Sequence, residues 1–333
     1  MPTYKIKHIT NYIYDTPVYD SINQILLYPV QDYFQKVIHH SLKISHKPAV
    51  DVFTDKFGNL LGIFSILSPH TQLSITSHVE VEVLPVLEPV SAKSIPELWQ
   101  EYDVLASNIF YRDFLTVESN QNAEAIHRLV TELQDTHLSP FENAKLFSAY
   151  IFTHFDYRRG VTSIETEIDE IWQLKAGVCQ DFAHMLLVLL RMIKIPARYV
   201  SGYICPKHHE FRGEGATHAW VEIYIPDYGW IGIDPTNNCI ASDKHVRIAV
   251  GRFFKDCTPV KGIFKGNLKH RLEVSVIAEN AEPERKNKYS SNIFLETDQH
   301  IAPSFVSHSN ADITADNLYQ AHLLMQIQMQ QQQ

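Results

Sequence analysis

Several features that mark particular classes of protein are scarce in this 333-residue sequence or missing from it. Its four cysteines form no CxxC pair and no regular framework, so neither a structural zinc site nor a disulfide scaffold is expected. Asp and Glu (38) outnumber Lys and Arg (29), which argues against a nucleic-acid-binding surface. No window approaches a membrane-spanning apolar run, and the first residues form no apolar signal-peptide core. We therefore expect a soluble cytoplasmic protein with reduced thiols and no membrane contact.

The first 88 residues favour β-structure. Apolar and polar residues alternate along residues 73–83, which is typical of a strand with one buried face. Residues 4–14 alternate more loosely and end at a turn signal, and residues 56–59 lie between two apolar runs as a hairpin turn. We expect an N-terminal antiparallel β domain over residues 1–88, without catalytic residues of its own.

Helical patterns begin after three prolines that lie between residues 85 and 96. Apolar residues recur at helical spacing over residues 121–133. Ser139 and Glu142 form a capping box with a proline at the first helical position, which predicts a helix running to about Phe152. We expect these helices to pack around a third helix that ends before Pro196.

That third helix begins at a cysteine, Cys179. Gly177 lies just ahead of it and allows close backbone approach, and the mostly apolar residues 182–192 behind it carry the helix into a core. Unpaired backbone N–H groups and the helix dipole favour a thiolate at a helix start, and the thiolate is the nucleophilic form. Cys179 is therefore a candidate nucleophile. The alternative is that it is a small buried apolar side chain, as many lone cysteines are.

Two strands downstream of the cysteine offer a base and a group to orient it. A turn placed at residues 226–229 would pair Ile225 with Trp230. In this register His218 falls opposite a position three residues beyond Asp234, a gap that a bulge or register shift covers. A cysteine nucleophile needs a base, and the base needs an orienting group. The cysteine, His218 and Asp234 therefore form a candidate catalytic triad.

Other polar residues nearby are weaker candidates. Gln173, six residues before the cysteine, could add a side-chain donor to the cysteine backbone N–H around an oxyanion. Asp181 suits the first turn of a helix on electrostatic grounds, and His184 points round the helix away from the nucleophile. The adjacent loop histidines His208 and His209 have no carboxylate or cysteine partners in sequence, so we expect no metal site.

The last part of the chain is less informative. Residues 245–252 and 268–278 alternate as strands do, and after residue 280 the composition becomes polar. Residues 314–328 have the spacing of an amphipathic helix. We expect a domain over residues 89–280 and a peripheral extension over 281–333, whose helix docks on the body, on a partner or on a second copy of the chain to form a homo-oligomer.

Four motifs, taken together and in this order, resemble the bacterial branch of the transglutaminase-like superfamily. They are GVCQDFA (177–183), RYVSGY (198–203), THAWVE (217–222) and GW-x3-DPT (229–236). The N-terminal strands resemble the β domain that precedes the catalytic domain in that branch, and residues 245–252 also match. The resemblance covers residue 1 to about 278.

This resemblance implies an α+β protein with an N-terminal antiparallel β domain and a papain-like, transglutaminase-like α+β catalytic domain. It implies Cys179 as nucleophile, His218 as general base and acid, and Asp234 as the orienting group, with no cofactor and no metal. The expected reaction is cysteine-dependent hydrolysis, by a protease or amidase, of amide bonds in a peptide or protein substrate. Transglutamination with an amine acceptor stays open, as does a catalytically inactive binding or scaffold module, because the sequence does not fix what accepts the acyl group.

Overall fold

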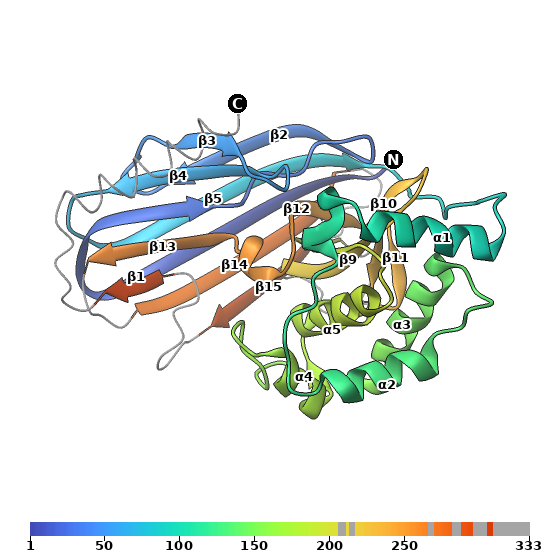
Figure 1. Ribbon diagram of the computed structural model, residues 1–333. Coiled ribbons are helices and arrows are strands. Elements are labelled where there is room, and N and C mark those ends of the chain that lie inside the picture. The colour runs from blue at the N-terminus through green and yellow to red at the C-terminus, as the bar shows by residue number, and fades with distance from the viewer. Residues whose placement is uncertain (206–210, 213–216, 266–269, 282–287, 296–304, 309–333) are drawn as a thin grey trace.

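A computed structural model describes residues 1–205, 211–212, 217–265, 270–281, 288–295 and 305–308. The fold has an antiparallel β domain and an α+β domain that pack against each other (Figure 1). The α+β fold class predicted from the sequence is therefore confirmed. Among the described residues, no helix has the length and apolar character needed to cross a membrane.

The long strand β1 organises the β domain. Its first half pairs with β5 and β14, and its second half pairs with β4 and β13. Along β5, every second residue from Leu73 to Val83 is buried, as the alternation of the sequence predicts. The strands that precede the helices are β1 (Thr3–Ile25), β2 (Gln35–Ile44), β3 (Asp51–Thr54), β4 (Leu60–Ile66) and β5 (His70–Val83).

Strands from the far end of the chain complete this sheet. β13 (Val260–Lys265) and β14 (His270–Asn280) pair with β1, and β15 (Lys288–Leu295) pairs with β14. β16 (Phe305–His308) pairs in parallel with β13. The predicted division at residue 280 therefore does not follow the strand pairing, because alternation identifies a strand but not its distant partner. The helix expected over residues 314–328 lies outside the described residues.

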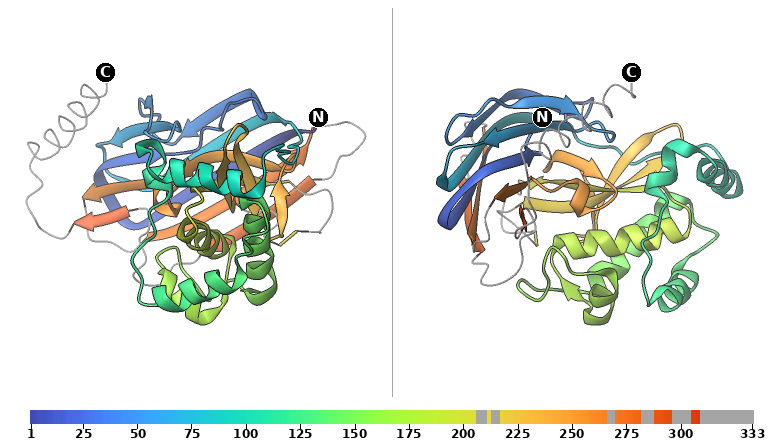
Figure 2. Two further views of the ribbon diagram at one scale, coloured as in Figure 1. Left: turned by 45° about the vertical axis from the view of Figure 1, so that its right-hand side comes forward. Right: turned by 60° about the vertical axis from the view of Figure 1, so that its left-hand side comes forward.

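The α+β domain is built on a five-stranded antiparallel sheet in the order β11-β10-β9-β8-β12. Helix α5 packs against β8 and β9, and α2, α3 and α4 pack against α5 (Figure 2). With neighbours on several sides, α5 buries all its residues from Met185 to Leu190, which explains its nearly unbroken apolar sequence. Its strands are β8 (Ala197–Ile204), β9 (Thr217–Ile225), β10 (Gly229–Asp234), β11 (Cys239–Ala241) and β12 (His245–Gly251).

The helices begin where their capping residues predict. Ser94 and Glu97 form a capping box at the start of α1, and Ser139 and Glu142 form another at α3. Pro196 follows the end of α5, as expected. The helices are α1 (Ile95–Ala106), α2 (Ala123–Leu133), α3 (Pro140–His154), α4 (Ile168–Leu174) and α5 (Cys179–Met192), with short 3₁₀ helices η1 (Ile109–Phe114) and η2 (Phe254–Asp256).

Two buried amide side chains of the β domain bridge the backbone of β12. Gln35 Nε2 donates to the Arg247 carbonyl (2.8 Å), and Gln35 Oε1 accepts from the Arg247 N–H (2.7 Å). Asn59 forms the same pair of bonds with Val250, at 2.7 and 2.8 Å. These amides therefore pair with β12 much as a neighbouring strand would.

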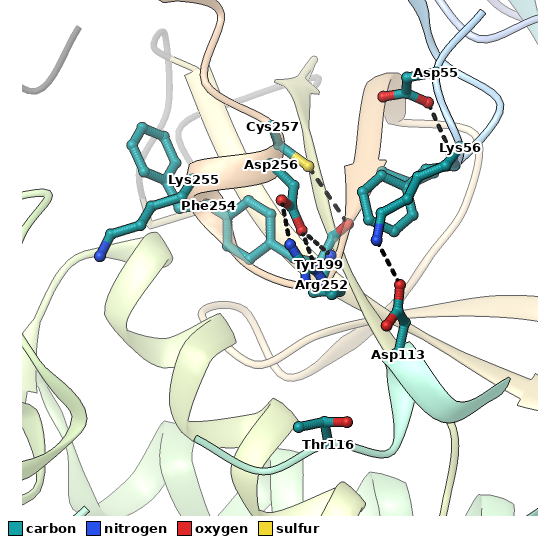
Figure 3. Close-up of polar contacts among 12 residues, drawn as sticks. Asp55, Lys56, Asp113, Thr116, Tyr199, Arg252, Phe254, Lys255, Asp256 and Cys257 are labelled. Atoms are coloured by element: carbon teal, nitrogen blue, oxygen red, sulfur yellow. Dashed lines mark hydrogen bonds and ion pairs between the residues drawn. The ribbon is translucent and has the colours of Figure 1, made fainter. Parts of the chain in front are cut away.

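The turn between β3 and β4 adds a third tie between the domains (Figure 3). Asp55 Oδ1 accepts from the Phe57 N–H at 2.8 Å and fixes the turn that the sequence predicts at residues 56–59. Lys56 then reaches across to form an ion pair with Asp113 of η1, at 2.7 Å. The β domain thus contacts both the sheet and the helical side of the α+β domain.

Candidate active site

Helix α5 begins in a tightly packed corner. The Asp181 carboxylate accepts from the Val178 N–H (2.7 Å) and from the Thr162 hydroxyl (2.6 Å), so it closes the first turn of the helix. Gly177 leaves the space that this carboxylate occupies, since a Cβ at this position would meet Asp181 Cγ at 2.7 Å. The close approach expected of the glycine is therefore present, and it places Cys179 at the first helical position.

Cys179 differs from the other three cysteines in its surroundings. All four are free thiols, and Cys179 is half-buried. Burial raises the pKa of Cys205 to about 12, and it raises that of Cys257 well above its ordinary value. Burial and the nearby charge of Asp234 raise the pKa of Cys239 to about 12. Each of these three thiols is therefore held in its unreactive protonated form.

The hairpin of β9 and β10 brings His218 to Asp234. Gly229 pairs with Ile225, so the predicted pairing of Ile225 with Trp230 is wrong by one residue. The reason is that Gly229 adopts a positive φ of 100°, which only glycine takes up readily, and β10 begins there. In the observed register His218 falls opposite a position two residues beyond Asp234, so both side chains project from the same face without a bulge.

The Asp234 carboxylate is buried and has hydrogen bonds to both oxygens. His218 Nε2 donates to Oδ2 at 2.8 Å, and the Asn237 side-chain amide donates to the same oxygen at 2.8 Å. Oδ1 accepts from the Thr236 N–H at 2.9 Å. His245 Nε2 makes a further contact with Oδ2 at 3.2 Å. These donors fix the carboxylate in an orientation that directs the imidazole of His218.

Charge and burial act in opposite directions on this pair. Burial works against the charged form of His218, but the charge and hydrogen bond of Asp234, helped by Cys179, raise the pKa of His218 to about 10. Burial likewise opposes ionisation of Asp234, yet the charges and hydrogen bonds of His218 and His245 hold its pKa well below the usual range. The pair is therefore an imidazolium beside a carboxylate at neutral pH.

The remaining nitrogen of His218 is left for Cys179. Nε2 is taken by Asp234, and Nδ1 is buried without a hydrogen-bond partner of ordinary geometry among the described residues. Cys179 interacts with the His218 ring, and its hydrogen bonding contributes to the raised pKa of His218. The Trp220 ring stacks on the imidazole of His218, with centroids 6.1 Å apart. The imidazole therefore lies between a carboxylate and a thiol, as in a catalytic triad.

Tyr157 is a further side chain at this site that the sequence analysis did not single out. It lies on β6 (Asp156–Tyr157), which pairs in parallel with β7 (Ala176–Gly177) just ahead of the cysteine. Burial, and then the charge of Cys179, raise the pKa of Tyr157. Its phenol is therefore a neutral hydroxyl near the nucleophile. No local sequence signal identifies it, because only the pairing of two-residue strands brings it there.

The weaker sequence candidates have other surroundings. Gln173 lies on the exposed side of α4, and among the described residues no contact of its side chain supports a role as oxyanion donor. His184 Nε2 accepts from the Phe254 N–H at 3.2 Å, and burial lowers the pKa of His184 to about 3, so it is a neutral packing residue, as its position round the helix predicts. His208 and His209 lie outside the described residues.

His218, Asp234 and His245 form the kind of cluster that also occurs in metal sites. One ligand atom from each lies within 4.8 Å of the others, and all three residues are buried. In this structure both imidazoles point at the same carboxylate oxygen at hydrogen-bond distance, 2.8 and 3.2 Å. Hydrogen bonding alone therefore accounts for the cluster.

The fold and this arrangement of cysteine, histidine and aspartate define a papain-like α+β protein. Residues 127–235 match the family described as the transglutaminase-like superfamily, and residues 4–82 match the bacterial transglutaminase-like N-terminal region. An uncharacterized protein of Mycobacterium leprae is 30% identical over 280 residues, which cover 82% of this chain and 96% of that protein. The chain belongs to the transglutaminase-like superfamily, as its motifs predict.

Two further likenesses concern proteins with a described activity. A solved structure from Cytophaga hutchinsonii, proposed to be a cysteine protease, has a TM-score of 0.65 at 19% identity and covers 88% of this chain and 98% of that one. At this identity the likeness shows the shared fold. A protein-glutamine gamma-glutamyltransferase of Pseudomonas aeruginosa is 31% identical over 134 residues, which are 37% of this chain and 19% of that protein.

Proposed function

We propose that this chain is a cysteine-dependent hydrolase of amide bonds in peptides or proteins. The observation that carries the proposal is the position of His218, which is held by Asp234 through Nε2 while its other side interacts with Cys179. An imidazolium beside a cysteine at a helix N-terminus stabilises the thiolate. The same proton is then in place for transfer to a leaving group.

The reaction follows the groups present. The Cys179 thiolate attacks the amide carbon, and the backbone N–H of Cys179, at the first position of α5, stabilises the oxyanion. His218 donates its proton to the leaving amine, which departs and leaves a thioester on Cys179. His218 then takes a proton from water as the water attacks the thioester. The C–S bond of the thioester then breaks, which releases the acid and regenerates the Cys179 thiolate beside the His218 imidazolium.

Amine transfer is the second candidate, and the similarity to the Pseudomonas transferase favours it. It shares every step up to the thioester. Hydrolysis needs only water as the acceptor, whereas transfer needs a second site that holds an amine against the thioester. We therefore rank hydrolysis first.

Acyl-donor profiling tests the proposal. A library of glutamine-containing and other peptides is incubated with the protein, with and without a primary amine, and products are identified by mass spectrometry. Release of acid alone supports the hydrolase, and incorporation of the amine supports the transferase. No turnover by the wild-type protein would contradict both and favour a binding module. Cys179→Ala is the control, since any turnover that survives in it does not use this nucleophile.

A further inference from the structure

His245 is a buried histidine that the proposed chemistry leaves without a role. It opens β12, only 5% of its surface is exposed, and its ring packs edge-on against Trp220 with centroids 5.1 Å apart. Its backbone N–H donates to the Ser242 carbonyl at 2.9 Å. In return, the Ser242 N–H donates to His245 Nδ1 at 3.3 Å. This reciprocal pair of bonds fixes the ring.

The contact with Ser242 decides which ring nitrogen of His245 carries the proton. A backbone N–H can only donate, so Nδ1 accepts and Nε2 carries the hydrogen. The Nε2–H of His245 is then aimed at Asp234 Oδ2, 3.2 Å away. Oδ2 is the same oxygen that accepts from His218 Nε2. One carboxylate oxygen therefore receives donors from two imidazoles.

The groups around His245 keep it neutral. Burial lowers its pKa, against the opposing effects of Asp234 and Asp243, and the charge of His218 lowers it further. A neutral imidazole in this tautomer donates to the carboxylate at neutral and alkaline pH. It thereby withdraws negative charge from the oxygen that holds the proton of His218.

We propose that His245 is a positioning residue, the fourth member of a Cys179–His218–Asp234–His245 relay, whose Nε2–H holds the Asp234 carboxylate and limits how strongly that carboxylate binds the His218 proton. This inference rests on the proposed function, because it assigns His245 to the same chemistry. Without this donor, Asp234 would hold His218 in its charged form more tightly. His218 would then be a poorer proton donor to a leaving amine.

The first test uses the wild-type protein and needs no substrate. Nitrogen-15 spectra of the histidine rings at pH 7 report which nitrogens carry hydrogen. We expect His245, assigned by comparison with His245→Gln, to be neutral with hydrogen on Nε2. The opposite tautomer, or a charged ring, would overturn the proposal. The proposal would also be overturned if the purified wild-type protein contained a stoichiometric metal ion and the His245→Met variant did not.

The second test follows the alkylation rate of Cys179 by iodoacetamide from pH 5 to 11. In His245→Met, which has similar length but no donor, we expect the upper inflection, where His218 loses its proton, to move up by about half a pH unit or more. His245→Gln, whose amide can still donate, should keep the wild-type profile. An inflection of His245→Met that stays in place or moves down would overturn the proposal, and so would equal shifts in both variants.

His8→Met is the matched control. His8 is another buried histidine of the β domain, 2% exposed. Its ring nitrogens contact the Tyr203 hydroxyl of β8 and the Thr10 hydroxyl of β1, and not Asp234. It should lose stability and keep the wild-type alkylation profile, and a matching shift in this variant would show that any lost buried histidine has the same effect. Because alkylation needs no acyl donor, these results stand apart from acyl-donor profiling. A profiling experiment without turnover would remove the proposed hydrolase and transferase activities, but it would not change the alkylation profiles.

Discussion

At the residue scale, reactivity at this site follows from where each thiol lies. Cys179 is half-buried at a helix start and interacts with His218, whereas Cys205 and Cys257 are buried. Cys239 is half-buried, but its raised pKa keeps it protonated. We expect iodoacetamide at pH 7 to alkylate Cys179 at least about tenfold faster than the other three, because the thiolate is the reacting form. Peptide mapping by mass spectrometry measures the four rates, and equal rates would show that no thiol here is activated.

His218→Ala extends this prediction to the base. Removing the imidazolium takes away the charge that stabilises the Cys179 thiolate, so alkylation of Cys179 at pH 7 should slow by about tenfold or more. His184→Ala is a suitable comparison, because His184 contacts the Phe254 backbone instead. A rate for His218→Ala that matches wild type would remove His218 from the site.

The buried pair also predicts how stability depends on pH. The pKa of His218 rises from its ordinary 6.5 to about 10 in the folded protein, mainly through Asp234 acting against burial. The folded state therefore binds this proton more tightly than the unfolded state does. The resulting stability is fully present below about pH 6.5 and is lost as the pH rises through 10. The urea midpoint of unfolding should fall further from pH 7 to pH 10.5 in wild type than in His218→Gln. Equal falls would contradict the assignment of this pH dependence to His218.

At the element scale, the turn between β9 and β10 decides whether the base and its carboxylate meet. A single-residue slip would turn His218 and Asp234 to opposite faces of the sheet. The predicted register contained this slip, and a bulge was needed to correct it. The structure avoids the bulge because β10 begins at Gly229 with φ of 100°. That conformation depends on the whole turn, so the glycine alone did not reveal it.

Gly229→Ala tests this reading of the turn. An alanine held at positive φ costs about 1–2 kcal/mol, so the variant should be destabilised by about that amount. Gly160→Ala, at φ of 77° in a loop outside the sheet, should lose similar stability. Only Gly229→Ala should also slow Cys179 alkylation, since only that turn sets the position of Asp234. If both variants slowed alkylation equally, the hairpin register would not be the cause.

Elements with strong local signals could be predicted from the sequence, and those without them could not. The capping box at Ser139 and the proline after α5 place helix ends correctly because their chemistry is local. The motifs around Cys179, His218 and Asp234 identified the family for a similar reason, since each motif is contiguous. Tyr157 and His245 escaped notice as site residues, because their relation to the site arises from pairing between segments far apart in the chain.

At the scale of the whole molecule, the sheet of the β domain contains strands from both the N-terminal and the C-terminal part of the chain. β1 pairs with β5 close by in sequence, and with β13 and β14, which follow the α+β domain. The α+β domain is therefore inserted between two parts of one sheet. The sequence predicts consecutive domains over residues 1–88 and 89–280 and an extension over 281–333. In the structure, strands from all three segments pair in one sheet, and the α+β domain lies between them in the chain. In addition to this connectivity, the side-chain amides of Gln35 and Asn59 join the β domain to β12.

The bridging amides give the prediction at this scale. Asn59 is 2% exposed and satisfies both the N–H and the carbonyl of Val250. Asn59→Ala would leave two buried backbone groups without their partner, which should lower the free energy of unfolding by about 2 kcal/mol or more. Gln35→Ala should act similarly through Arg247, whereas Gln72→Ala, on the exposed face of β5, should change little.

Gln35 and Asn59 both bond to the backbone of β12. Replacing both residues therefore tests whether these hydrogen bonds or the other contacts between the domains make the two domains unfold together. If the bridges couple the domains into one unfolding unit, the Gln35→Ala and Asn59→Ala double variant should unfold in two steps in urea, with the β domain and the α+β domain reporting different midpoints. Tryptophan fluorescence follows the α+β domain, because Trp99, Trp172, Trp220 and Trp230 all lie there. Far-ultraviolet circular dichroism follows both domains. Buried apolar residues of the two domains, among them Ile6, Val246 and Ile248, also form one cluster. Coincident transitions in the double variant would show that this apolar cluster couples the domains without the amide bonds.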